Sequence, residues 1–112
     1  MNEQIKQIIA DFTKYKGKDY QILCAVEEMA ELTKALMKNI NRQKDNVEDI
    51  FEELADVVIT LEEIKIIYGI SDARIWEYLN EKMPRKWHPR IEKWKARVVE
   101  TGNPNANKRV LD

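Results

Sequence analysis

The chain contains little of the residue types that form the best-known metal and redox sites. Its 112 residues include one cysteine, Cys24, and one histidine, His88. One cysteine excludes an internal disulfide bond and supplies too few thiolates for a zinc–thiolate or iron–sulfur site. A di-iron site in a helical bundle needs paired Glu-x-x-His motifs, which a single histidine cannot provide. Iron is therefore not expected, and a reducing cytoplasm is the expected location.

The chain also lacks an excess of charge of one sign and a long apolar run. With 19 basic and 20 acidic residues the formal net charge is −1, so no overall positive field attracts nucleic acid or an anionic membrane. The first residues, MNEQIKQIIADF, include acids and no long apolar stretch, so we expect neither a signal peptide nor a membrane span. An anionic ligand must therefore be bound by local groups, and neither nucleic acid nor a membrane is expected as a partner.

Helix-breaking residues are few and lie between stretches of helical periodicity. Only three glycines and three prolines occur. The pattern predicts helices over about residues 5–15, 19–39, 47–68 and 72–83, and a short last helix from residue 89. Asp19, Asn46 and Ser71 are the expected N-caps, and Pro84 is expected to interrupt the fourth helix. We therefore predict an all-α bundle of about four to five helices, as one domain over residues 1–100 followed by a polar tail over residues 101–112.

The second and third predicted helices each carry an apolar stripe. The residues of the first stripe are Leu23, Val26, Ala30, Thr33 and Met37. The third helix is apolar over much of its circumference, more than the few helices of one small chain can cover. We therefore expect the chain to form a homo-oligomer, a dimer or a tetramer.

Two pairs of acids border these predicted core surfaces. Glu28 and Glu31 lie in VEEMAEL, and Glu53 and Asp56 lie in FEELADV. Residues three apart share one face of a helix, so each pair places like charges about 5–6 Å apart at Cβ. A solvated acidic face is one interpretation, and Glu27, Glu52, Glu62 and Glu63 are expected to be surface residues of that kind.

The position of the two pairs favours a second interpretation. Helical winding places the first pair beside the small residues Cys24 and Ala35, and Glu53 beside the apolar stripe of the third helix. A short connection favours antiparallel neighbours, which brings the pairs to similar height, so that four carboxylates converge. Such a cluster needs protons or a cation. Oxygen ligands without histidine or cysteine select Mg²⁺, with Mn²⁺ as an alternative.

The paired motif resembles that of the MazG-like all-α nucleoside triphosphate pyrophosphohydrolases, particularly small phage-type members. The match is E-x-x-E at residues 28–31, then 21 intervening residues, then E-x-x-D at residues 53–56. The stretches EEMAELTKALMK and EELADVVITLEEI also resemble stretches of family members in sequence. The resemblance covers roughly residues 20–90. The paired motif with its apolar flanks is more specific than either half alone.

The resemblance implies hydrolysis of a nucleoside triphosphate between the α- and β-phosphates, which gives the monophosphate and pyrophosphate. It implies that Glu28, Glu31, Glu53 and Asp56 hold catalytic Mg²⁺. It also implies a dimer or tetramer with sites built partly at subunit contacts. No activated serine, cysteine or histidine nucleophile is evident, and metal-bound water needs none. The general base, the preferred base and sugar, and a role in pool sanitation (house-cleaning) or in nucleotide supply stay open.

A triphosphate also requires cations from the protein. The stretch NEKMPRKW resembles the Asn-x-Lys-Phe-x-Arg segment of larger family members, which carries over to Asn80, Lys82 and Arg85. Met83 replaces the family's aromatic residue and Pro84 follows it, so the segment departs from the family's pattern.

Lys34 and Lys38 lie along the edge of the acidic face of the second helix. They are expected either to contact phosphate or to form intrahelical pairs with Glu27 and Glu31. The alternative function for the whole chain is a non-catalytic helical interaction module whose acidic face is solvated. Metal binding distinguishes that module from a pyrophosphohydrolase.

Overall fold

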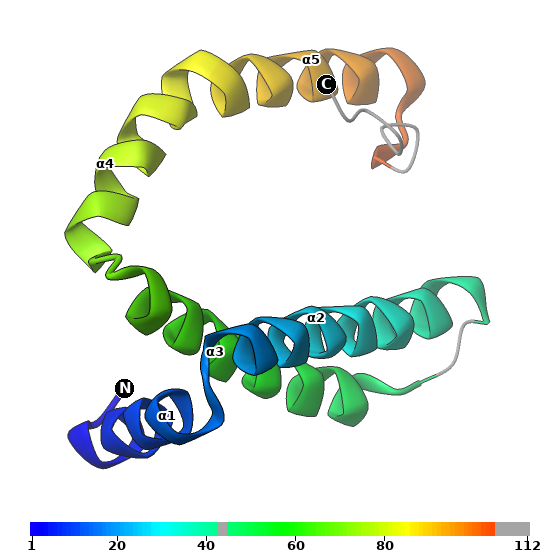
Figure 1. Cartoon of the computed structure of the whole chain (residues 1–112). Helices are drawn as coiled ribbons and strands as arrows, with labels where there is room; N and C mark the ends of the chain where they lie inside the picture. Colours follow the sequence, from blue (N-terminus) through cyan, green and yellow to red (C-terminus); the bar gives the residue numbers. More distant parts are fainter. Residues whose placement is uncertain (43–44, 105–112) are drawn as a thin grey trace. The chain divides into compact units, whose positions relative to one another are not determined.

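The computed structural model describes residues 1–42 and 45–104, and these residues are helical without any strand (Figure 1). The elements are α1 (Glu3–Lys16), α2 (Lys18–Asn41), α3 (Val47–Tyr68), α4 (Asp72–Lys82), the π-helical segment η1 (Met83–Trp87) and α5 (His88–Thr101). The predicted all-α class is confirmed. Residues 43–44 of the predicted connection and residues 105–112 of the predicted tail lie outside the described ranges. None of the helices in those ranges has the length and apolar character needed to cross a membrane.

The helices belong to two compact units, the first ending at Ile70 and the second beginning at Ser71. The first unit contains α1, α2 and α3, and the second contains α4, η1 and α5. The predicted division into a domain over residues 1–100 and a tail stays a prediction.

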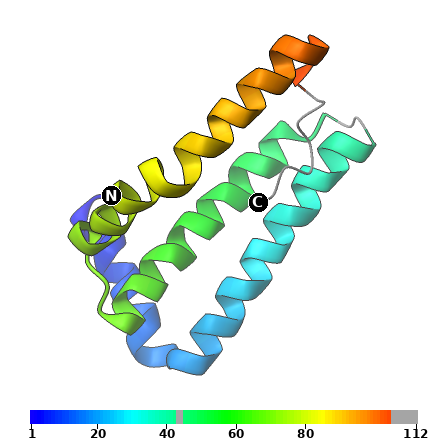
Figure 2. The same cartoon turned by 90° about the horizontal axis from the view of Figure 1, so that it is seen from above.

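In the first unit α2 and α3 lie side by side and antiparallel, and α1 packs against both (Figure 2). Asn2 caps α1 by accepting a hydrogen bond from the backbone N–H of Ile5 at 2.8 Å. Gly17, with φ of 84°, separates α1 from α2, and Gly69 ends α3 in the left-handed conformation. Glycine adopts these positive φ angles without the clash that a Cβ atom causes. Because Gly17 is the N-cap of α2, the expectation that Asp19 caps this helix is wrong.

The face of α2 that packs within the unit is not the predicted apolar stripe. The buried residues of α2 are Gln21, Ala25 and Ala35. Small side chains permit the close approach of α3, whereas Leu23 and Val26 of the predicted stripe are 63% and 58% exposed. The stripe therefore does not form the core of the described unit, and the prediction that it marks the buried face is wrong.

Asn46 fastens the start of α3 to α2. It was expected to cap α3, but its side chain makes no cap hydrogen bond. Instead its Nδ2 donates to the carbonyl oxygen of Ala35 at 3.0 Å, and its Oδ1 accepts from Asn39 Nδ2 at 3.1 Å. Asn46 is buried, so these bonds replace contacts with water that the side chain cannot make.

Replacing Asn46 by alanine is expected to lower the free energy of unfolding by about 1–3 kcal/mol, because it leaves the Ala35 carbonyl without this donor. Chemical denaturation measures the change. The control is Asn41→Ala, at an exposed position near the end of α2. Equal stability of the two variants would contradict this role of Asn46.

The second unit is a helical segment interrupted by a wider turn. Ser71 caps α4 as predicted, because its Oγ accepts a hydrogen bond from the N–H of Arg74 at 3.2 Å. Pro84 has no N–H to donate to the preceding turn. The backbone forms the π-helical segment η1 at this point and continues directly into α5. The predicted interruption at Pro84 is confirmed as a change of helix type rather than a break.

Candidate metal centre

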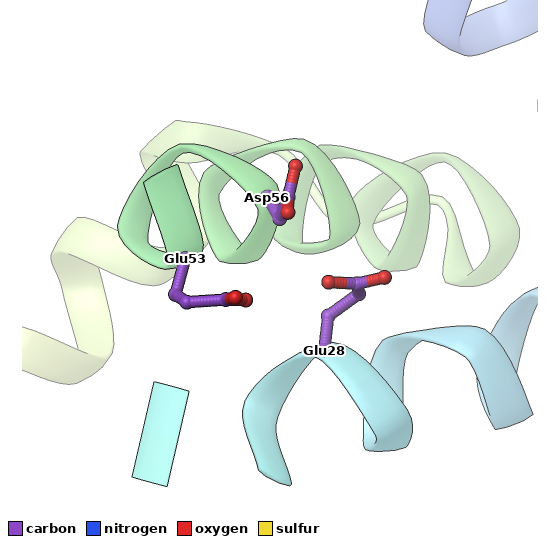
Figure 3. Close-up of side chains that lie close together, drawn as sticks. All are labelled: Glu28, Glu53 and Asp56. Carbon is purple, nitrogen blue, oxygen red and sulfur yellow. The ribbon is translucent and has the colours of Figure 1, made fainter. Parts of the chain in front are cut away.

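Three carboxyl groups point into one space between α2 and α3. Glu28 comes from α2, and Glu53 and Asp56 come from α3, where their spacing of three residues places them on one face. One carboxylate oxygen from each of the three lies within 4.8 Å of the others (Figure 3). Glu28 and Glu53 are half-buried and Asp56 is exposed. We call these three residues the acidic triad.

The surroundings disfavour the charged form of two members of the triad, Glu28 and Glu53. Partial burial raises the pKa of Glu28 above its ordinary value, and the charges of Asp56, Glu53 and Glu31 raise it further. Partial burial also raises the pKa of Glu53, again with contributions from Asp56 and Glu31. A bound cation would offset both effects, because it replaces lost hydration and neutralises the mutual repulsion.

Glu31, the fourth predicted ligand, is not part of the triad. It lies on α2, is exposed, and lines a neighbouring cleft together with Glu53. Its charge still raises the pKa of both Glu28 and Glu53. Of the four acids predicted to converge, the structure thus brings three together and leaves the fourth beside them.

A cleft next to the triad is lined by two lysines, Lys34 and Lys38, and we call it the lysine cleft. Its volume is about 130 Å³. It is lined by Glu31, Lys34, Ala35, Lys38, Asn46, Asp49 and Glu53. In the part of the chain that the structure describes, neither lysine forms an ion pair with Glu27 or Glu31. Of the two expectations for these lysines, intrahelical pairing is not what the structure shows.

On the other side of the triad a second cleft extends between α1, α2 and α3, and we call it the Glu63 pocket. Glu28 and Asp56 form part of its wall. Glu63 is only 7% exposed, and its Oε2 is buried without a hydrogen-bond partner. The prediction that Glu63 is a surface residue is therefore wrong. A sequence signal existed, because Glu63 follows Asp56 by seven residues, which is two helical turns along the same face.

Asn80, Lys82 and Arg85 belong to the second unit, on α4 and η1. Arg85 forms a bidentate ion pair with Glu81, in which Nε donates to Oε1 and Nη2 donates to Oε2 at 3.1 Å. This hydrogen bonding lowers the pKa of the Glu81 carboxyl. The role of these three residues in binding a triphosphate stays a prediction.

Comparison of the chain with models of known protein families, with curated proteins and with solved structures found no match. The resemblance to MazG-like enzymes therefore depends on the motif residues of the sequence and stays a prediction.

Proposed function

We propose that the chain hydrolyses a nucleoside triphosphate to the monophosphate and pyrophosphate, with Mg²⁺ held by Glu28, Glu53 and Asp56. The observation that carries the proposal is the approach of their three carboxylate oxygens to within 4.8 Å of one another. This donor set fits a hard divalent cation, which accepts carboxylate oxygens and completes its coordination with water and substrate phosphate.

The chain's own residues have two roles in the proposed reaction, holding the ion and binding the phosphate chain. Glu28, Glu53 and Asp56 fix the position of the ion, and Lys34 and Lys38 neutralise and orient the phosphate chain from the neighbouring cleft. When bound, Mg²⁺ supplies neutralisation of phosphate charge and a water molecule of lowered pKa. Glu31 stands beside the triad as a carboxylate that can contact the ion's water ligands.

The test is a panel of deoxynucleoside and nucleoside triphosphates incubated with Mg²⁺ and scored for pyrophosphate and for orthophosphate. Pyrophosphate as the product supports cleavage between the α- and β-phosphates. Orthophosphate without pyrophosphate contradicts it. Absence of both products, together with no response to Mg²⁺, favours the interaction module.

The lysine cleft supplies a separate prediction. The double replacement of Lys34 and Lys38 by alanine should raise KM for the triphosphate by roughly tenfold or more, the scale expected for lost charge-assisted hydrogen bonds. Mg²⁺ affinity measured by calorimetry without nucleotide should not fall, because neither lysine can bind a cation. The control is Lys14→Ala, on the exposed surface of α1. An unchanged KM in the double variant would remove the lysines from the site.

The alternative function, a non-catalytic interaction module, is favoured by one observation. Large apolar side chains of α2 and α3 are exposed in the first unit, including Leu23, Val26, Phe51 and Val58. Exposed apolar side chains of this size typically contact another molecule when they form a patch. A pyrophosphohydrolase that forms oligomers also buries apolar side chains between its subunits, so their exposure does not distinguish the two functions, whereas Mg²⁺ titration does.

We predict that the chain is at least a dimer at micromolar concentration, because exposure of these large apolar side chains to water is unfavourable. Light scattering measures the mass. Phe51→Asp, at a 61% exposed position, should shift the mass towards the monomer, and Glu48→Gln at the exposed start of α3 should not. A monomeric mass of the unmodified chain would contradict the prediction.

A further inference from the structure

The Glu63 pocket opens directly from the acidic triad. Glu28 and Asp56 belong both to the triad and to the wall of the pocket. The volume of the pocket is about 230 Å³. Pockets for whole drug-sized ligands span roughly 300–1,000 Å³, so this one suits a single ring system rather than an entire nucleotide. A ligand whose phosphates lie at the triad can place another part of itself here.

Two of the polar side chains that line the pocket, Gln21 and Thr60, donate hydrogen bonds to backbone carbonyl oxygens. The side-chain Nε2 of Gln21 donates to the carbonyl oxygen of Phe12 at 2.9 Å. The hydroxyl of Thr60 donates to the carbonyl oxygen of Val57 at 2.8 Å. What these two side chains retain is acceptor capacity, on the Gln21 amide oxygen and the Thr60 hydroxyl oxygen.

Glu63 adds an acceptor that has no partner. Its side chain is more than nine-tenths buried, and Oε2 makes no hydrogen bond. Burial of an unpaired polar atom is unfavourable, and such atoms are few in folded proteins. Lys16 also lines the pocket and its charge acts on this carboxyl, but its Nζ lies 4.8 Å from the centre of the Phe12 ring and does not bond to Oε2. An occupant of the pocket that donates a hydrogen bond would therefore supply the partner that Oε2 lacks.

The rim of the pocket offers a surface for a flat ring. Phe12 is 47% exposed and lines the pocket together with Ile59. Nucleobases stack on aromatic side chains, and this contact depends little on which base is present. The choice between bases then depends on the acceptors at Gln21, Thr60 and Glu63.

We infer that the Glu63 pocket binds the base of the nucleotide and favours bases with an exocyclic amino group, namely cytosine, adenine and guanine. The amino group donates to the Glu63 carboxyl, with Gln21 and Thr60 as further acceptors. Uracil and thymine have no amino group, and the one donor on their Watson–Crick edge, N3–H, lies between two carbonyl oxygens. They therefore place at least one carbonyl oxygen against the acceptors of the pocket. This inference rests on the proposed function for the position of the phosphates.

The test compares hydrolysis of dCTP, dATP and dGTP with hydrolysis of dTTP and dUTP. The unmodified chain should show kcat/KM at least tenfold higher for one or more of the amino-bearing nucleotides than for dTTP and dUTP. Glu63→Gln keeps the size of the side chain and adds an N–H donor, which can pair with a carbonyl oxygen. It should reduce that preference by roughly tenfold, since unpaired polar groups in a site discriminate strongly between such ligands.

Glu62→Gln is the matched control. Glu62 is the preceding residue of α3, lies outside the Glu63 pocket and pairs with Lys65 at 2.5 Å. The control should leave the base preference unchanged. Thr60→Val is a second variant that removes one acceptor and should weaken the preference in the same direction. A thermal melt of each variant verifies that it is folded.

A second readout separates this inference from the proposed function. Calorimetric binding of dCMP, dAMP, dGMP and dTMP requires no hydrolysis. If triphosphates are not hydrolysed but an amino-bearing monophosphate binds through Glu63, the proposed hydrolysis is contradicted and the proposed base pocket is supported. The base pocket is contradicted, and the hydrolysis is supported, by either of two results. One is hydrolysis with the same base preference in the unmodified chain and in Glu63→Gln, and the other is hydrolysis with dTTP and dUTP preferred. Neither hydrolysis nor binding overturns both.

Discussion

Replacing Glu53 by glutamine is expected to reduce both Mg²⁺ affinity and turnover steeply. The change keeps the size of the side chain but removes one of the three carboxylates that approach within 4.8 Å. Loss of a partner that only supports a metal ligand typically costs about 10–100-fold in affinity or activity, and loss of a ligand itself should exceed that. Calorimetry with Mg²⁺ and a pyrophosphate-release assay measure the two effects.

The same substitution should raise the melting temperature in EDTA. Without metal, Glu53 repels Asp56 and Glu31, and the amide removes that repulsion. If Glu53 instead stabilised the fold through a salt bridge, the amide would lower the melting temperature and leave metal binding unchanged. The control is Glu48→Gln, which changes the net charge equally at an exposed position outside the triad. A Glu53→Gln variant that melts earlier in EDTA yet hydrolyses triphosphates normally would refute the proposed site.

The stability of the protein should depend on pH in opposite ways with and without Mg²⁺. Burial raises the folded-state pKa of Glu28 and Glu53 above the ordinary value of 4.5. Between that value and the raised values, the folded protein binds more protons than the unfolded chain. Stability in EDTA therefore falls as the pH rises through this window. Glu63, whose pKa is also raised by burial, contributes with the same sign.

Mg²⁺ should reverse this trend, because the ion binds the deprotonated carboxylates. The gain in stability on adding Mg²⁺ should therefore be greatest above the window and disappear as the pH falls towards 4.5. At a free concentration about 100 times Kd the gain is about 2.7 kcal/mol. Calorimetric melts across the pH range, in Mg²⁺ and in EDTA, measure it. A gain that is independent of pH, or absent throughout, would contradict a carboxylate-held ion.

Much of the fold could be predicted because local rules determine it. Helical periodicity, Gly17, Gly69, Ser71 and Pro84 mark where helices begin, end or change, and these signals depend only on nearby residues. The sequence could not show which face of each helix is buried. α2 has an apolar stripe and, on another side, the small residues Ala25 and Ala35, and it is the second side that packs in the described unit.

In the candidate site, too, features set by nearby residues could be predicted, and features set by packing between helices could not. Glu28, Glu53 and Asp56 come together because two motifs with a spacing of three residues lie on antiparallel helices, which the sequence implied. Glu63 was missed although its spacing of seven residues from Asp56 places it on the same face of α3. Its burial depends on residues of α1 and α2 that line the same pocket, and the sequence does not show which distant segments come together. Likewise, Asn46 has the residue type and position of a helix cap but bonds to α2 instead.

The most direct test of the metal centre is a crystal grown with Mn²⁺ in place of Mg²⁺ and examined for anomalous scattering. The proposed function predicts a peak between α2 and α3, within bonding distance of carboxylate oxygens of Glu28, Glu53 and Asp56. The peak should be absent in Glu53→Gln and present in Glu48→Gln. If the unmodified chain hydrolyses triphosphates with Mn²⁺ in solution, yet its crystal shows the ion bound elsewhere, the assignment of the acidic triad is contradicted.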